Sequence, residues 1–170
     1  MNVDDIDVRP LRGADLEEVL DAVAGLRITV FRDWPYLYDG SPDYEREYLR
    51  AYRDNPGALI VGAFHDGRLV GASTSTPMEE HAPEFSAPFE ALGIPTARIL
   101  YGAESVLLRP YRGIGLGHRF IDLREAHARA LGRTHVAFCS VIRPEDHPAR
   151  PAVFRSVSYT HLTLPTILRV

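Results

Sequence analysis

A chain of 170 residues is long enough for one domain with a sizeable core, and 45% hydrophobic with 25% charged residues is ordinary globular composition. The formal net charge of -4 leaves no basic excess to neutralise phosphates, so we expect no nucleic-acid partner. The acidic N-terminus lacks a signal-peptide core, no apolar run reaches the length of a membrane span, and the single cysteine allows no internal disulfide, so we expect a cytoplasmic protein without a membrane partner.

The first part of the chain predicts a strand followed by two helices. Residues 6–10 are typical of a short strand, and Asp15 with Glu18 three residues later matches a capping box that begins a helix. Helical spacing predicts that this helix buries one face, formed by Val19, Val23, Leu26 and Val30. After a link punctuated by proline and glycine, residues 42–55 predict a second, more polar helix.

The middle of the chain predicts a hairpin and then a loop. Two apolar runs within residues 58–77 flank His65-Asp66-Gly67, and Asp-Gly is a strong hairpin signal. Residues 79–97 are rich in proline and glutamate, and we expect them to form an irregular loop over one end of the sheet, with one helical turn near Phe89.

The last predicted elements are a long strand at 98–108, a glycine-rich turn, a helix to about Leu131 and a strand at 134–142. Strands and helices in this order predict an α/β (α+β) fold with a mixed central sheet flanked by helices. The hairpin in the middle argues against a purely parallel, doubly wound sheet.

The glycine-rich turn, Arg112 to Gly117 (RGIGLG), is the most informative motif in the sequence. A helix N-terminus carries unpaired N–H groups and the positive end of the helix dipole, and it binds phosphate. Gly113, Gly115 and Gly117 remove side chains that would hold an anion away from the backbone. The alternative is a tight strand-to-helix turn without a ligand. The motif is not a P-loop, because no Lys-Ser or Lys-Thr follows, and its third glycine is misplaced for a dinucleotide fingerprint.

Arg112 to Gly117 resembles the Arg/Gln-x-x-Gly-x-Gly/Ala acyl-CoA pyrophosphate motif of the GNAT N-acetyltransferase superfamily, and the order of elements over roughly residues 6–150 is similar as well. The resemblance implies that acetyl-CoA binds where the strands 98–108 and 134–142 separate. It implies backbone contacts to pantetheine at the end of the first strand and to pyrophosphate in the turn. The cofactor-binding residues implied in this way are Val106, Leu107, Leu108, Arg112, Gly113, Ile114, Gly115, Leu116 and Gly117.

Members of this superfamily usually transfer acetyl directly to an amine, which must first lose a proton to a base. Glu104 is the expected base, because it is the only acid between Glu90 and Asp122 and lies in an apolar strand, where burial favours a stronger base. The alternative is a glutamate that faces solvent or pairs with an arginine for structure. Gly102 marks either a bulge that opens the strand or a site of close packing.

The link between the first two helices usually lines the acceptor site in this superfamily. Trp34, Tyr36 and Tyr38 are therefore the expected substrate-binding residues, and the alternative is a loop packed down by its own aromatic rings. The resemblance implies a small-molecule amine or a peptide as the acceptor, and its identity stays open. The seven histidines show no zinc spacing, so we expect no metal, and a homodimer is possible because many relatives are dimers.

The C-terminal residues do not fit the family pattern. Residues 157–166 (VSYTHLTLPT) resemble the translation of a transposase adapter used in sequencing libraries. We therefore expect one domain at 1–156, incomplete at its C-terminus and missing the last helix and strands of the family, followed by a non-native tail at 157–170. The alternative is a real short strand. The expected function is an acetyl-CoA-dependent N-acetyltransferase, and the alternative is a non-catalytic acyl-CoA-binding module of the same fold.

Overall fold

The computed structural model describes residues 2–81, 83–139, 141, 143–152 and 167–169. Its six strands lie side by side in chain order in one sheet. The strands are β1 (Asp7–Leu11), β2 (Leu59–His65), β3 (Arg68–Pro77), β4 (Ile99–Leu107), β5 (His135–Phe138) and β6 (Ile167–Arg169). Neighbouring strands from β1 to β4 are antiparallel, whereas β4, β5 and β6 are parallel. The mixed sheet predicted from the sequence is confirmed.

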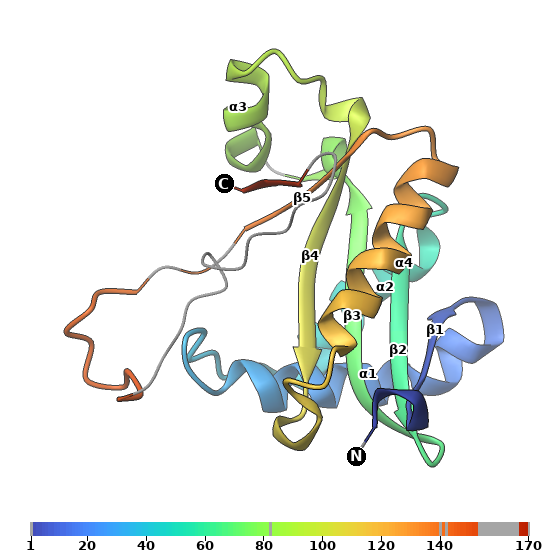
Figure 1. Ribbon diagram of the computed structural model, residues 1–170, viewed down its shortest axis with the longest axis vertical. Helices are drawn as coiled ribbons and strands as arrows, with labels where there is room; N and C mark the ends of the chain where they lie inside the picture. Colours follow the sequence, from blue (N-terminus) through green and yellow to red (C-terminus); the bar gives the residue numbers. More distant parts are fainter. Residues whose placement is uncertain (1, 82, 140, 142, 153–166, 170) are drawn as a thin grey trace.

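Helices cover both faces of this sheet (Figure 1). The α-helices are α1 (Gly13–Phe31), α2 (Pro42–Asp54), α3 (Pro83–Ala91) and α4 (Leu116–Ala130). Short 3₁₀ turns occupy Val3–Asp5, Met78–Glu80, Thr96–Arg98 and Arg109–Tyr111. In Figure 1, α4 crosses in front of the strands, α1 and α2 lie behind them, and α3 lies near one end.

The strand β2 contributes side chains to the hydrophobic clusters on both faces of the sheet. Side chains of successive strand residues point to opposite faces. Leu59, Val61 and Ala63 pack with α4 in one cluster, whereas Ile60 and Phe64 pack with α1 and α2 in the other. The predicted hairpin is confirmed: Asp66 and Gly67 form its turn with positive φ angles of 50° and 75°.

The predicted start of α1 is wrong by two residues. The helix begins at Gly13 after the N-cap Arg12, which makes no side-chain cap. Asp15 instead pairs with Arg9 at 3.0 Å, so the capping box does not form. Among the residues predicted for the buried face, Val23 and Leu26 are buried, whereas Val19 and Val30 pack half-buried at the edge of the cluster.

The region 79–97 is more regular than predicted. The helix α3 is longer than the single turn expected there, and its Phe89 is buried against Met78 and Ile99. The last predicted strand, 134–142, ends at Phe138.

The predicted tail, 157–170, lies outside the described residues except for Ile167–Arg169. These three residues form β6 beside β5, in a part of the fold where no further strand was expected. That the tail is not native stays a prediction.

Candidate active site

The strands β4 and β5 separate soon after they meet. Within the described residues they pair at Ile99 with His135, Leu100 with Val136 and Tyr101 with Ala137, while β4 continues to Leu107. A cavity of about 280 Å³ opens at this point. It is lined by Tyr36, Gly102, Ala103, Glu104, Ser105, Gly117, His118, Ile121, Arg124, Phe138 and Cys139. This is the place where the family resemblance puts the cofactor cleft.

A β-bulge forms part of the wall of this cavity. Ser75 of β3 pairs with Gly102 and Thr74 pairs with Glu104, so Ala103 has no partner on β3. A bulge redirects the side chains that follow it and is common next to active sites. Gly102 also packs closely, because a Cβ atom at this position would lie 3.3 Å from Cζ of Arg124. Both explanations considered for this glycine therefore apply.

The glycine-rich turn leads directly into the N-terminus of α4. Gly115 is the N-cap, has a φ of 97°, and leaves the first turn without a side-chain cap. Gly113 has a φ of 80°, and a Cβ atom at Gly113, Gly115 or Gly117 would meet nothing within 4 Å. Free N–H groups at the positive end of a helix, in open surroundings, suit an anion.

The other predicted cofactor residues lie beside this turn. Val106 and Leu116 are buried in the core, so only their backbone could serve a ligand. Leu107 and Leu108 are half-buried, and the carbonyl oxygen of Leu107 accepts a hydrogen bond of 2.9 Å from Nε of Arg112. Of the predicted cofactor residues, Gly117 lines the cavity. The cofactor-binding role of all nine residues, Gly117 included, stays a prediction.

Glu104 lines the cavity and also belongs to a buried ion pair. Its carboxylate contacts the guanidinium of Arg27 in α1 and accepts a hydrogen bond of 3.2 Å from Oη of Tyr48 in α2. The side chain of Glu104 is only 8% exposed. The apolar surroundings expected from its strand are thus incomplete, because α1 brings an arginine to it. Its role as a base stays a prediction.

Arg27 connects Glu104 to a second buried acid. Its Nε donates to the carboxylate of Glu45, which is fully buried in α2, and its Cζ lies 4.2 Å from the ring centre of Tyr48. Two carboxylates therefore share one guanidinium, and one formal negative charge has no counterpart in this cluster. The hydroxyl groups of Tyr48 and Tyr52 lie 2.6 Å apart, and burial raises the pKa of both phenols.

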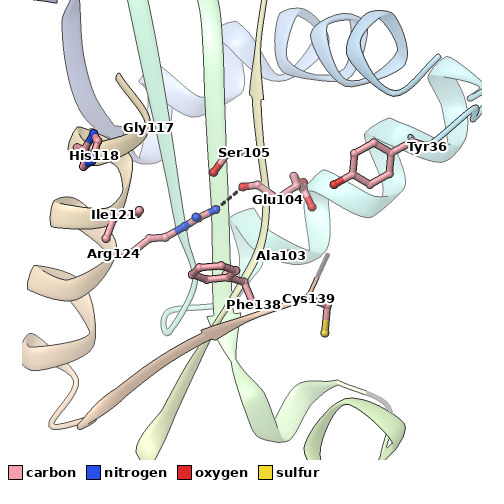
Figure 2. Close-up of a pocket in the computed structure, with 11 residues that line it drawn as sticks. Tyr36, Ala103, Glu104, Ser105, Gly117, His118, Ile121, Arg124, Phe138 and Cys139 are labelled. Carbon is pink, nitrogen blue, oxygen red and sulfur yellow. Dashed lines mark hydrogen bonds between the residues drawn. The ribbon is translucent and has the colours of Figure 1, made fainter. Parts of the chain in front are cut away.

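The three predicted acceptor residues lie in different surroundings, and their role in substrate binding stays a prediction. Tyr36 lines the cavity and packs on Phe31 with ring centres 4.5 Å apart. Tyr38 packs against the core, and burial followed by the charge and hydrogen bond of Glu45 raises the pKa of its phenol. Trp34 packs on the ring of His147. Of these three aromatic residues, only Tyr36 lines the cavity, where it approaches from the side opposite α4 (Figure 2).

Arg124 of α4 is a residue that the sequence analysis did not identify. It is 5% exposed, and its guanidinium donates to Oγ of Ser75 at 3.0 Å and to the carbonyl oxygens of Thr74 and Glu104. Figure 2 shows the hydrogen bond to Glu104. Burial lowers the pKa of Arg124 to about 10, so it stays charged at neutral pH. The signal was an arginine at a core position, four residues after the buried Phe120. Arg27, four residues after the buried Val23, carried the same signal.

Within the described residues, no three His, Cys, Asp or Glu side chains gather as they would around a metal ion. None of the helices that the structure describes has the length and apolarity needed to cross a membrane.

A family model described as Acetyltransferase (GNAT) family matches residues 26–153 of the chain. None of the curated proteins matches the sequence.

Solved structures with the same fold include two aminoglycoside N-acetyltransferases. AAC(6')-Iy in complex with CoA has a TM-score of 0.61 at 15% identity, over 80% of this chain and 77% of that one. AAC(6')-Ih from Acinetobacter baumannii has a TM-score of 0.62 at 16% identity, over 88% and 96%. A ribosomal-protein-alanine N-acetyltransferase from Brucella melitensis biovar Abortus 2308 has a TM-score of 0.54 at 18% identity, over 78% of each chain. At these identities the likeness is one of fold.

Proposed function

Because the chain belongs to the GNAT acetyltransferase family, we propose that it transfers an acetyl group from acetyl-CoA directly to a primary amine. The observation that carries the proposal is the cavity between β4 and β5. It joins the uncapped N-terminus of α4, at Gly117, to a buried acid, Glu104, at the bulge of β4. One end suits a phosphate and the other suits a proton acceptor. We place this activity in the cytoplasm, in keeping with the single unpaired cysteine.

The residues present fit acetyl-CoA as the co-substrate. The turn before α4 is open, and its glycines leave room for pyrophosphate to approach the backbone N–H groups of residues 113–117. Residues 106–108 follow the bulge on the β4 edge that β5 leaves unpaired, and in the proposal their backbone holds the pantetheine arm. Acetyl-CoA supplies the activated thioester carbonyl carbon.

In the proposed reaction, Glu104 removes the proton that prevents an ammonium group from attacking a carbonyl. A C–N bond then forms at the carbonyl carbon and the C–S bond breaks, so that the thiolate leaves and takes up the proton that the attacking nitrogen loses. Glu104 is suited to this role because it reaches the cavity while Arg27 and Tyr48 fix its orientation.

The acceptor in this proposal is a small-molecule amine or a peptide amine. Tyr36 would contact it, since this ring faces the cavity from the link between α1 and α2. Two of the similar structures are aminoglycoside N-acetyltransferases and one is a ribosomal-protein-alanine N-acetyltransferase, so both classes belong in an amine panel.

The first test is binding of acetyl-CoA to the full chain, followed by thiol release with a panel of amines. We expect acetyl-CoA to raise the Tm, and Gly115→Asp to abolish the shift because it puts a carboxylate at the anion site. Gly132→Asp is the matched control. Gly132 also has a positive φ, of 71°, and open surroundings, but it lies just past the other end of α4. No Tm shift in the unmodified chain would contradict the proposal.

The second test is Glu104→Gln. We expect kcat to fall on the order of a hundredfold, because a positioned base contributes about that much or more. The KM for acetyl-CoA should change less than about threefold, because the pyrophosphate contacts stay intact. Glu47→Gln, at an exposed position of α2, is the control. An unchanged kcat would remove Glu104 from the mechanism.

One observation favours a second candidate function, a non-catalytic acyl-CoA-binding module. The carboxylate of Glu104 is already paired with Arg27, as in a purely structural ion pair. In that case acetyl-CoA would raise the Tm, yet no amine in the panel would release the thiol.

A further inference from the structure

The bulge of β4 lacks the support that a regular strand has on its two edges. On one side Ala103 has no partner on β3, and on the other side the last pair with β5 among the described residues is at Tyr101. The residues that carry the proposed base are therefore held only partly by the sheet. Something else must fix their backbone if the carboxylate of Glu104 is to keep one position at the cavity.

Arg124 supplies that support from α4. Its Nη2 donates to the carbonyl oxygens of Thr74 and Glu104, which lie opposite each other on β3 and β4 beside the bulge. Its Nε donates to Oγ of Ser75, the next residue of β3. One guanidinium thus bridges the two strands at the point where the bulge interrupts their ladder.

Burial of the charged Arg124 side chain costs free energy of desolvation unless its hydrogen bonds compensate for the loss. It continues the buried row of Leu116 and Phe120 along α4, where an apolar side chain would pack without loss of hydration. Within the described residues, no carboxylate forms an ion pair with it. A buried, charged side chain without an acidic partner, whose bonds go to two backbone carbonyls and a hydroxyl, is built to hold a backbone.

Gly102 is matched to this arginine. A Cβ atom at position 102 would lie 3.3 Å from Cζ and Nε of Arg124 and 3.4 Å from Nη1. A side chain at residue 102 would displace the guanidinium by a few tenths of an ångström, so glycine lets the guanidinium lie directly against the strand. Figure 2 shows Arg124 reaching across from α4 to the backbone of Glu104.

We propose that Arg124 is a positioning residue that clamps the bulge of β4 and thereby holds the carboxylate of Glu104 at the cavity. In this arrangement the guanidinium packs against Gly102. The proposal rests on the proposed function in so far as Glu104 is the base. The clamp itself is a property of the free protein and can be measured without any substrate.

The first measurement is hydrogen exchange of the free, full-length protein. Arg124→Met should speed exchange of the amides from Gly102 to Ser105 by about tenfold or more, because their backbone loses its bridge. Amides of β2 should stay unchanged. Arg129→Met is the control, because Arg129 is an exposed arginine of the same helix that pairs with Glu125 at 2.8 Å. Unchanged exchange at the bulge in Arg124→Met would overturn the clamp.

The second measurement is a double-mutant cycle with Glu104→Gln. Arg124→Met should lower kcat about tenfold or more with the KM for acetyl-CoA within about threefold, and Arg124→Lys should be intermediate. In the Glu104→Gln background, Arg124→Met should change kcat less than about twofold, because no base is left to position. A purely structural role would give equal losses in both backgrounds, and that result would overturn the proposal.

Two further variants keep the proposal testable if Arg124→Met does not fold. Arg124→Lys keeps the charge but loses the bridge, and Gly102→Ala pushes the guanidinium away by a few tenths of an ångström. Both should speed exchange at the bulge, and no change in either would overturn the clamp. If the unmodified chain transfers acetyl to no amine, the proposed function fails, whereas faster exchange in these variants still supports the clamp.

Discussion

At the scale of single residues, the most consequential feature is a buried arginine between two buried acids. Arg27 is 6% exposed and contacts the carboxylates of Glu45 and Glu104. An ion pair in the interior adds little over well-packed apolar residues, but removal of one partner leaves the other charge buried and unpaired. The guanidinium is therefore more important for stability than either acid, because both carboxylates pair with it.

Arg27→Met should lower the free energy of unfolding by about 3–5 kcal/mol at neutral pH, because it leaves two carboxylates in the interior without a counter-charge. Urea denaturation followed by circular dichroism measures the loss. Arg32→Met is the matched control in the next turn of the chain, where Arg32 and its partner Asp39 are both exposed. Equal stabilities of the two variants would show that Arg27 does not stabilise the two buried carboxylates.

The sequence identified Glu104 but not its partners, and the reason is physical. A single acid in an apolar strand is visible in a window of ten residues, as is a glycine beside it. The contacts of Arg27 and Arg124 depend on how α1 and α4 pack on opposite faces of the sheet. Both arginines occupy apolar positions of a helical pattern, so their burial could have been predicted, although the atoms they bind could not.

At the scale of elements, the glycine-rich turn followed from the sequence and α3 did not. Alternating glycines between a strand and a helix predict a turn with positive φ angles, and Gly113 and Gly115 have them. The segment that forms α3 contains Pro88 and reads as a loop. The helix forms there because Phe89 is buried beneath it, which is a tertiary effect that overrides local propensity.

Gly117 differs from the two glycines before it, since it lies within α4 and lines the cavity. Gly117→Ala should stabilise the free protein slightly, by up to about 0.5 kcal/mol, because alanine favours a helix over glycine. The same methyl group should weaken acetyl-CoA binding about tenfold or more, because it separates the phosphate from the backbone N–H groups. Calorimetric titration and urea denaturation measure the two effects.

The matched control for this variant is Gly25→Ala. Gly25 lies in the middle of α1, is exposed, and would also meet nothing within 4 Å with a Cβ atom. Alanine there should stabilise the helix by about 0.5–1 kcal/mol and leave acetyl-CoA binding unchanged. If Gly117→Ala binds acetyl-CoA as tightly as Gly25→Ala does, the N-terminus of α4 is not the anion site.

At the scale of the whole molecule, the two helical layers decide which polar residues become interior. The strand β3 lies in the middle of the sheet with α1 and α2 on one face and α4 on the other, so the run Ser73 to Thr76 is buried. Two of its hydroxyls then have specific partners, because Ser75 accepts from Arg124 and Thr76 contacts His81. Nothing local in the sequence marks this run as interior.

His81 links this interior to the pH dependence of global stability. It is half-buried, bonds the hydroxyl of Thr76, and packs edge-on to the ring of Tyr101 with centres 4.4 Å apart. Burial lowers the pKa of His81 below its ordinary value of 6.5. The His81 ring therefore binds a proton less readily in the folded protein than in the unfolded chain. Above pH 6.5 the ring is neutral in both states, so it does not lower the free energy of unfolding. That free energy decreases as the pH falls from 6.5 through the lowered pKa of the folded state.

His81→Gln should flatten this dependence, because glutamine keeps a polar partner for Thr76 but does not titrate. Free energies of unfolding measured by urea between about pH 7.5 and 5 should fall less steeply in His81→Gln than in the unmodified chain. His118→Gln, at an exposed position of α4, should keep the original slope. A slope that stays unchanged in His81→Gln would mean that other groups cause the loss of stability in acid. The packing of His81 against β3 and β4 would then not contribute to the pH dependence of the free energy of unfolding.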